Sequence, residues 1–265
     1  MADTEGNSKC KGAEMEEIRI EYLEKPELSD PIFIEGLPGV GNVGKLAAEH
    51  LLDELDAKKF AEIFSKHFPP QVVVDDSGIV RLVGNQLYYV RQDGDHRDFI
   101  ILVGDFQGLT PEGQYELSDF VMNVLLEMKV KRIFTLGGYG IGRMIAKPRV
   151  IGAATHDSLV ADMKKLGVVF PKGEPGAGIV GASGLLLGIG KLHGLECICL
   201  MGETSGYFVD PKSAQSVLEV LQKALGIELD FSNLEERAKH IDQIASKLKE
   251  VEEGVERKED LGYFG

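Results

Sequence analysis

The sequence has few of the features that mark secreted, nucleic-acid-binding or membrane proteins. Its three cysteines, Cys10, Cys197 and Cys199, form no C-x-x-C pair, which argues against a disulfide framework or a zinc knuckle. Only 29 Lys and Arg stand against 43 Asp and Glu, and this net charge of -14 argues against a nucleic-acid partner. No apolar run reaches membrane-spanning length, and the polar, acidic start is unlike a signal peptide. We therefore expect a cytoplasmic protein without a nucleic-acid or membrane partner.

Apolar, strand-like segments alternate with helical segments through most of the chain. The segments PIFIEG, DFIILVGDF, RIFTLGGYG and ECICLMGET have the pattern of buried strands. Thr110 followed by Pro111 is a typical start of a helix. This alternation predicts an α/β fold with a mostly parallel central sheet flanked by helices. The runs GIVRLV and QLYYVR, joined through Gly84 and Asn85, predict a β-hairpin.

The composition divides the chain into four parts. We expect a disordered leader at 1–15, an α/β core domain at 16–230, an amphipathic C-terminal helix at 231–253 and a flexible tail at 254–265.

The C-terminal helix begins with a pattern that predicts a capping box, formed by Ser232 and Glu235. Its apolar positions recur at helical spacing and form one seam, consisting of Leu234, Ala238, Ile241, Ala245 and Leu248. The seam either packs on its own domain or lies between subunits.

The stretch GLPGVGNVGK contains two overlapping nucleotide-binding motifs, and neither is complete. Gly39, Gly41 and Gly44 spell G-x-G-x-x-G, but the second strand lacks a terminal acid for the ribose hydroxyls. The same stretch spells G-x-x-x-x-G-K, but Leu46 stands where a hydroxyl would hold magnesium. We expect no nucleotide cofactor. The glycines then serve either close packing between strand and helix or the binding of some other anion.

Polar residues follow the predicted strand ends, where ligands bind in open α/β sheets. They are Asp105, Gln107, Tyr139, Arg143 and Glu203. These residues either line a ligand pocket or cap helices and satisfy loop backbones.

Other catalytic and metal-binding motifs are incomplete. Ser183 lies in GASGL, where Leu185 replaces the second glycine of a nucleophile elbow, so we interpret Ser183 as a helix N-cap. The six histidines show no metal-ligand spacing, and we assign no metal.

The chain resembles the archaeal branch of the proteasome assembly chaperone family. The resemblance rests on GLPGVGNVGKLAAEHL, FPPQVVV, GDFQ, LGGYG and GETSGY, and it spans roughly residues 17–250. It implies a fold similar to purine nucleoside phosphorylases and related hydrolases, no catalytic activity, and binding to proteasome α-subunits or a related assembly. It also implies a homo-oligomer of four or five subunits, with a pentamer favoured, and leaves open whether a homologous chaperone joins the complex.

Family members often end in a hydrophobic residue, tyrosine and one further residue, which slot between neighbouring α-subunits. This chain ends in Tyr263, Phe264 and Gly265, so Phe264 lacks the tyrosine hydroxyl. Two aromatic anchors and a free carboxylate suit a pocket with apolar walls and a lysine. The first hypothesis is a non-enzymatic, ATP-independent chaperone or adaptor that acts through this tail. The alternative is a phosphorylase- or hydrolase-like enzyme that uses the strand-end pocket.

Overall fold

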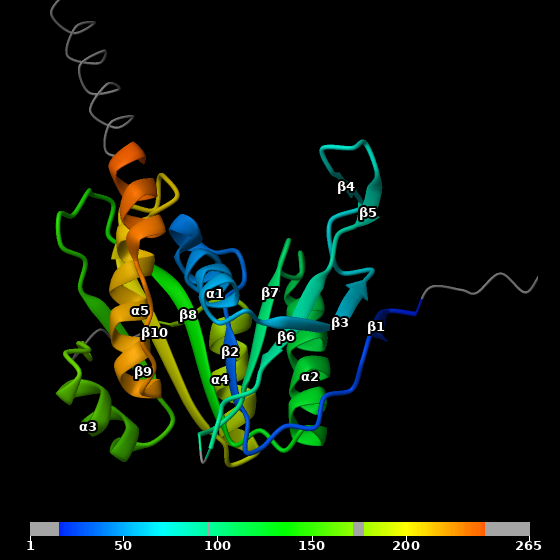
Figure 1. Ribbon diagram of the computed structural model, residues 1–265, viewed down its shortest axis with the longest axis horizontal. Helices are drawn as coiled ribbons and strands as arrows, with labels where there is room; N and C mark the ends of the chain where they lie inside the picture. The colour runs from blue at the N-terminus through cyan, green and yellow to red at the C-terminus, as the bar shows by residue number, and fades with distance from the viewer. Residues whose placement is uncertain (1–15, 95, 172–177, 242–265) are drawn as a thin grey trace, which may run out of the picture.

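The computed structural model describes residues 16–94, 96–171 and 178–241, so the expected leader and tail lie outside the described residues. One central sheet crosses the molecule and carries helices on both faces (Figure 1). This arrangement confirms the predicted α/β class.

The sheet has eight strands in the order β1-β3-β6-β7-β2-β8-β10-β9. Its four central strands, β7, β2, β8 and β10, are parallel, and the outer strands on both sides pair antiparallel. The bounds are β1 (Ile18–Tyr22), β2 (Ile32–Glu35), β3 (Lys58–Ser65), β6 (Asn85–Val90), β7 (Phe99–Gly104), β8 (Arg132–Gly140), β9 (Val150–Ala154) and β10 (Glu196–Thr204). The predicted parallel centre is confirmed, and it brings the carboxyl ends of four strands to one end of the molecule.

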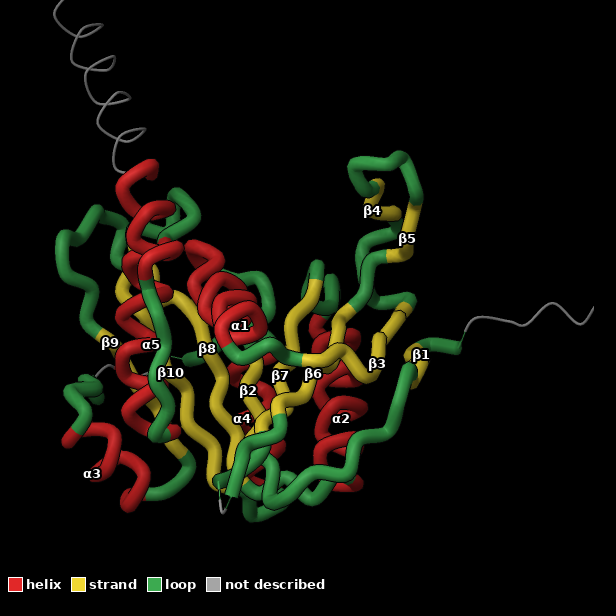
Figure 2. Tube along the Cα trace, in the orientation of Figure 1, coloured by secondary structure: helices red, strands yellow, loops and turns green. Residues whose placement is uncertain are grey.

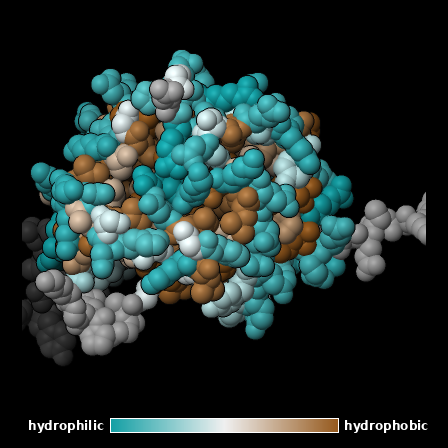
Figure 3. All heavy atoms as spheres, turned by 90° about the horizontal axis from the view of Figure 1, so that it is seen from below, coloured by the Kyte–Doolittle hydropathy of each residue, from teal (hydrophilic) through white to brown (hydrophobic). Residues whose placement is uncertain are grey.

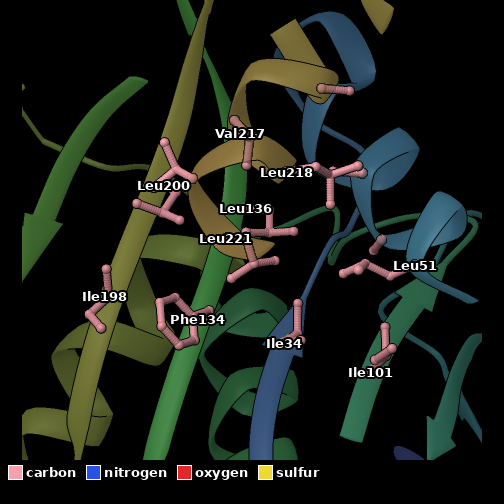
Figure 4. Close-up of a cluster of buried hydrophobic side chains, with 14 of the residues drawn as sticks. Ile34, Leu51, Ile101, Phe134, Leu136, Ile198, Leu200, Val217, Leu218 and Leu221 are labelled. Carbon is pink, nitrogen blue, oxygen red and sulfur yellow. The ribbon is translucent and has the colours of Figure 1, made fainter. Parts of the chain in front are cut away.

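Helices cover the two faces of the central strands and create two apolar cores. The helices are α1 (Val43–Glu54), α2 (Pro111–Glu127), α3 (Asp157–Lys165), α4 (Ala182–Leu192) and α5 (Pro211–Leu225). Helices α1, α3 and α5 contribute to one core, where Leu51 and Leu218 pack with Phe134 of the sheet (Figure 4). Helices α2 and α4 contribute to the other core on the opposite face (Figure 2).

Side-chain caps fix where two of these helices begin. The Thr110 hydroxyl accepts a hydrogen bond from the Gly113 amide, 3.1 Å away, and Pro111 is the first residue of α2. Asp210 caps α5 in the same way, and Gly226 ends that helix with a φ of 71°. The predicted start of a helix at Thr110 and Pro111 is therefore confirmed.

The predicted hairpin through Gly84 is wrong. Strand β5 (Val80–Leu82) pairs with β4 (Val72–Val74) in a separate two-stranded sheet, whereas β6 begins at Asn85 and lies between β3 and β7. The turn forms earlier because the Asp75 carboxylate accepts hydrogen bonds from the amides of Ser77 and Ile79. We call residues 71–82 the arm.

The C-terminal helix is described from 232 to 241, and it packs on its own domain. Leu234 is 1% exposed and belongs to the core beneath α1 and α5. The predicted capping box is wrong, since the Asp230 carboxylate accepts hydrogen bonds from both the amide and the hydroxyl of Ser232. Ala245 and Leu248 of the predicted seam lie outside the described residues.

The surface at the end opposite the strand carboxyl termini is mixed in polarity. Viewed from below, hydrophilic side chains surround smaller apolar areas (Figure 3). In the part of the chain that the structure describes, no helix has the length and apolar character needed to cross a membrane.

Candidate functional site

The glycine-rich loop 36–42 joins β2 to α1 across the end of β8. A Cβ atom on Gly44, the second residue of α1, would lie 2.1 Å from the Leu136 carbonyl oxygen, so only glycine lets the helix approach β8 this closely. Gly41 adopts a φ of 62°, and its carbonyl accepts a hydrogen bond from the Asp210 amide at 2.9 Å. These contacts support the packing interpretation of the two overlapping motifs.

Asp105 follows β7 and fixes the base of the arm. The Arg81 guanidinium donates two hydrogen bonds to its carboxylate, at 2.6 and 2.9 Å, and the Gly84 amide donates a third at 3.0 Å. Burial raises the pKa of Asp105, but the hydrogen bonds from Arg81 and Gly84 outweigh it and hold the pKa below its usual range. Asp105 is therefore ionised and committed to a structural ion pair.

Glu203 near the end of β10 is committed to an ion pair as well. Its carboxylate accepts hydrogen bonds from the Arg149 guanidinium, with the Nε contact at 2.9 Å, and from the Arg149 amide. Hydrogen bonding from Arg149 lowers the pKa of Glu203 more than burial raises it. Arg143 lies exposed on the loop 141–149 and adds a smaller electrostatic contribution in the same direction.

Gln107 and Tyr139 line a cavity of about 570 Å³ at the carboxyl ends of the central strands. The Gln107 amide group donates to the Pro38 carbonyl at 2.7 Å and accepts from the Ala182 amide at 2.9 Å, so it joins the loop after β2 to the start of α4. The loops after β2 and β7 lead to helices on opposite faces, and such a divergence is the usual place for ligands in open α/β sheets. The volume suits a small molecule.

The predicted single pocket is divided in the structure. Asp105 borders a separate cleft of about 390 Å³ beside α1, together with Lys45 and Arg81. Side chains alternate between the faces of a strand, so Asp105 lies on the same face as Val103, on the α1 side. Gln107 instead reaches α4 on the other face. Neither Glu203 nor Arg143 lines the cavity that contains Tyr139.

A buried carboxyl group that no sequence motif indicates lies behind this cavity. Glu35, the last residue of β2, is fully buried and accepts hydrogen bonds from the Leu37 amide at 2.9 Å and the Ser183 hydroxyl at 2.8 Å. Burial raises the pKa of Glu35 from 4.5 to about 7, although both hydrogen bonds oppose the increase. The sequence signal was an acid in an otherwise apolar strand, since acids are rarely buried completely.

The Glu35–Ser183 pair places a hydroxyl group at the cavity wall with a carboxyl group behind it. Ser183 lines the cavity, and its interpretation as an N-cap is wrong, because α4 begins after Gly181 and the hydroxyl donates to Glu35 instead. A carboxylate within hydrogen-bond reach is able to accept the proton of a nucleophilic hydroxyl. Among the described residues, the cavity lining contains apolar, glycine, amide and hydroxyl groups but no ionised side chain.

The two cysteines of β10 offer no reactive thiol. Cys197 and Cys199 are buried in the core beneath α2 and α4. Burial raises the pKa of each thiol to about 12, so both stay protonated at neutral pH.

The geometry agrees with comparisons to known proteins. The model of the PAC2 family matches residues 33–249. The chain belongs to the PAC2 family. An uncharacterized protein of Methanocaldococcus jannaschii is 40% identical over 90% of this chain and 93% of its own length.

Two solved structures are similar over nearly all of both chains. Pyrococcus furiosus PbaB, described as an archaeal proteasome activator, is 44% identical with a TM-score of 0.85, covering 89% of this chain and 100% of its own. Pyrococcus furiosus PbaA, described as an archaeal homolog of proteasome-assembly chaperone, is 30% identical with a TM-score of 0.74. The match covers 94% of this chain and 98% of PbaA. The resemblance drawn from the sequence is therefore confirmed. Tyr263, Phe264 and Gly265 lie outside the described residues.

Proposed function

We propose that this protein is a non-enzymatic, homo-oligomeric chaperone or adaptor that binds proteasome α-subunits through its C-terminal tails. The observation that carries the proposal is the likeness over almost the whole chain to PbaB, itself described as an archaeal proteasome activator. The likeness to PbaA, described as an archaeal homolog of proteasome-assembly chaperone, supports the same class of partner.

The anchored C-terminal helix supports the role of the tail. Leu234 and Ala238 are buried against the domain, so the described part of this helix, which ends at residue 241, is held on the molecule. One short tail must lose conformational freedom on binding and buries little area, so it binds weakly alone. Several tails on one homo-oligomer compensate by avidity.

Surface plasmon resonance on immobilised α-rings tests the proposal. Deletion of residues 261–265 should abolish binding without changing the fold or the oligomer mass, and Phe264→Ala should weaken binding strongly. Phe264→Tyr should bind as well as the intact chain or better, because it restores the hydroxyl that family tails carry. Tyr115→Ala, on an exposed aromatic residue of α2, is the matched control and should bind normally. Equal binding by the truncated protein would refute the role of the tail.

A phosphorylase- or hydrolase-like activity is the second candidate, and the Glu35–Ser183 pair at the cavity is the observation that favours it. Assays with nucleosides plus phosphate, and with ester substrates, decide between the two. The chaperone proposal expects no turnover beyond that of Ser183→Ala. Turnover that is lost in both Ser183→Ala and Glu35→Gln would establish the enzyme instead.

A further inference from the structure

The arm carries an apolar surface that its own chain leaves exposed. Five of its side chains are at least 47% exposed, namely Val72, Val74, Ile79, Val80 and Leu82. The arm extends away from the central sheet (Figure 1). A two-stranded hairpin is marginally stable by itself in water, and clustered exposed apolar side chains mark an interaction surface.

The arm is nevertheless anchored at its base, and its turn is closed at the tip. At the base, Arg81 is held by the two hydrogen bonds to Asp105. At the tip, the Asp75 carboxylate closes the turn through the amides of Ser77 and Ile79. The apolar surface is therefore presented in a defined orientation.

The tip of the arm is negatively charged. Asp75 is ionised, since hydrogen bonds from Ser77 and Ile79 lower its pKa, and Asp76 beside it is exposed. Arg81 is the arm's one basic residue in the sequence, and its charge is paired with Asp105. The surface that fits the arm is therefore apolar and basic.

Such a surface exists on the same chain, at the loop 141–149. The loop contains Arg143, Lys147 and Arg149 and no acid, although the whole chain has a net charge of -14. Arg149 pairs with Glu203, whereas Arg143 and Lys147 are exposed and form no ion pair with any residue that the structure describes.

Exposed apolar side chains accompany these charges. Met144 of the loop is 48% exposed, and it shares a small cavity with Phe208 and Val209, which are 40% and 41% exposed. The basic loop and this apolar cluster together have the polarity that the arm requires.

The two surfaces lie at opposite sides of one molecule. The arm leaves β3, which is next to one edge of the sheet, and the basic loop joins β8 to β9 at the other edge. Both lie at the carboxyl ends of the parallel strands (Figure 1). A contact between two different surfaces of identical chains is head-to-tail, and it closes into a ring when the rotation between copies allows.

We infer that the arm of one copy packs on the loop 141–149 of the next copy. Asp76 then faces Arg143 and Lys147, and the apolar side chains of the arm cover Met144 and Phe208. This inference rests on the homo-oligomer of the proposed function and assigns its interface. It needs no contact between the arm and a proteasome subunit.

Charge reversal with light scattering tests this assignment. Asp76→Arg should lower the mass at micromolar concentration, because the new arginine faces two cations. Arg143→Glu combined with Lys147→Glu should do the same from the other side. Asp93→Arg makes the same charge change in an exposed loop between β6 and β7 and should leave the mass unchanged. Circular dichroism checks that every variant is folded.

Mixing the two dissociated variants gives the sharper result. In a head-to-tail contact, the altered arm of one variant fits the altered loop of the other, and the two unaltered surfaces also fit each other. The equimolar mixture should therefore form alternating rings, which close for an even number of subunits and leave one mismatch for an odd number.

The outcomes separate this inference from the proposed function. A monomeric wild-type protein would refute both the homo-oligomer and its interface. A wild-type mass in both charge variants would refute the arm contact alone. Variants that keep the wild-type mass but lose binding to α-rings would show that the arm contacts the proteasome, and would overturn the inference as well.

Discussion

Glu35 shows how one buried carboxyl group links the cavity to the stability of the fold. Its pKa is about 7 in the folded chain, against 4.5 as the ordinary value, so the folded state binds more protons between these two pH values. Stability therefore falls as the pH rises through this window. The difference corresponds to about 3 kcal/mol as an upper figure.

Glu35→Gln should remove this loss of stability. The amide stays uncharged, its oxygen still accepts from Leu37, and its nitrogen is able to donate to the Ser183 hydroxyl. Urea unfolding measures the free energy of unfolding across this pH window. Relative to the wild type, this free energy should increase for the variant by about 3 kcal/mol from pH 4.5 to about 7. Glu236→Gln, on an exposed glutamate of the C-terminal helix, is the control. Parallel profiles for wild type and Glu35→Gln would contradict the prediction.

The glycines of the opening loop differ in what they do, and a matched pair of variants separates them. Gly44→Ala should destabilise the fold by about 1–3 kcal/mol or more, because its methyl group meets the Leu136 carbonyl. Gly39→Ala should change stability by less than about 1 kcal/mol, because Gly39 is extended and its Cβ would meet no atom within 4 Å. Thermal unfolding measures both. Equal effects would refute the packing interpretation.

Residue-scale prediction from the sequence succeeded for the start of α2, but it failed for the caps assigned to Ser183 and Ser232 and for neighbours across strands. Thr110 and Pro111 act within one helical turn, so their role could be predicted from neighbouring residues in the sequence. The Glu35–Ser183 pair spans 148 positions, and nothing local in the sequence indicates that contact. Asp105 and Gln107 are two residues apart, yet they border different cavities.

At the scale of elements, periodicity predicted most helices and strands, but turn chemistry was misassigned once. Gly84 and Asn85 look like a hairpin turn, whereas the turn forms at Asp75 and Gly78 instead. Asn85 belongs to β6 because the main sheet offers two pairing strands, and the arm offers one. A long-range pairing preference of this kind is absent from any local dipeptide signal.

The C-terminal helix gives a prediction about anchoring. Leu234→Ala should cost about 2–5 kcal/mol of stability, because the side chain is 1% exposed and lies in the core beneath α1 and α5. Leu192→Ala removes the same atoms at a position that is 86% exposed, and it should change stability by less than about 0.5 kcal/mol. Denaturant midpoints compare the two. A cost for Leu234→Ala no greater than the control would mean that the helix does not depend on this contact.

At the scale of the whole molecule, the fold class was predictable because buried parallel strands are almost continuously apolar. The order of the strands in the sheet was not predictable. Strand β2 lies between β7 and β8, which follow it in the sequence by more than sixty positions. Family membership could be recognised from short motifs because several of them, including GLPGVGNVGK and LGGYG, form the strand ends around one cavity.

The homo-oligomer of the proposed function gives the last prediction, which concerns avidity. A synthetic peptide of residues 254–265 has the same C-terminal residues as the protein, but it presents only one tail. If several tails of one homo-oligomer bind together, the intact protein should bind α-rings roughly 10²- to 10⁴-fold more tightly than the peptide.

Mixed oligomers make the test quantitative. Intact chains and chains lacking residues 261–265, unfolded and refolded together in varied ratios, should give particles with fewer tails at a constant number of subunits. Dissociation from immobilised α-rings should become faster with each lost tail, because every bound tail holds the others near their pockets. A peptide in which Phe264 is replaced by alanine is the control for specific binding. If the peptide binds as tightly as the intact protein, or if dissociation is independent of tail number, each tail acts alone and the oligomer has a different purpose.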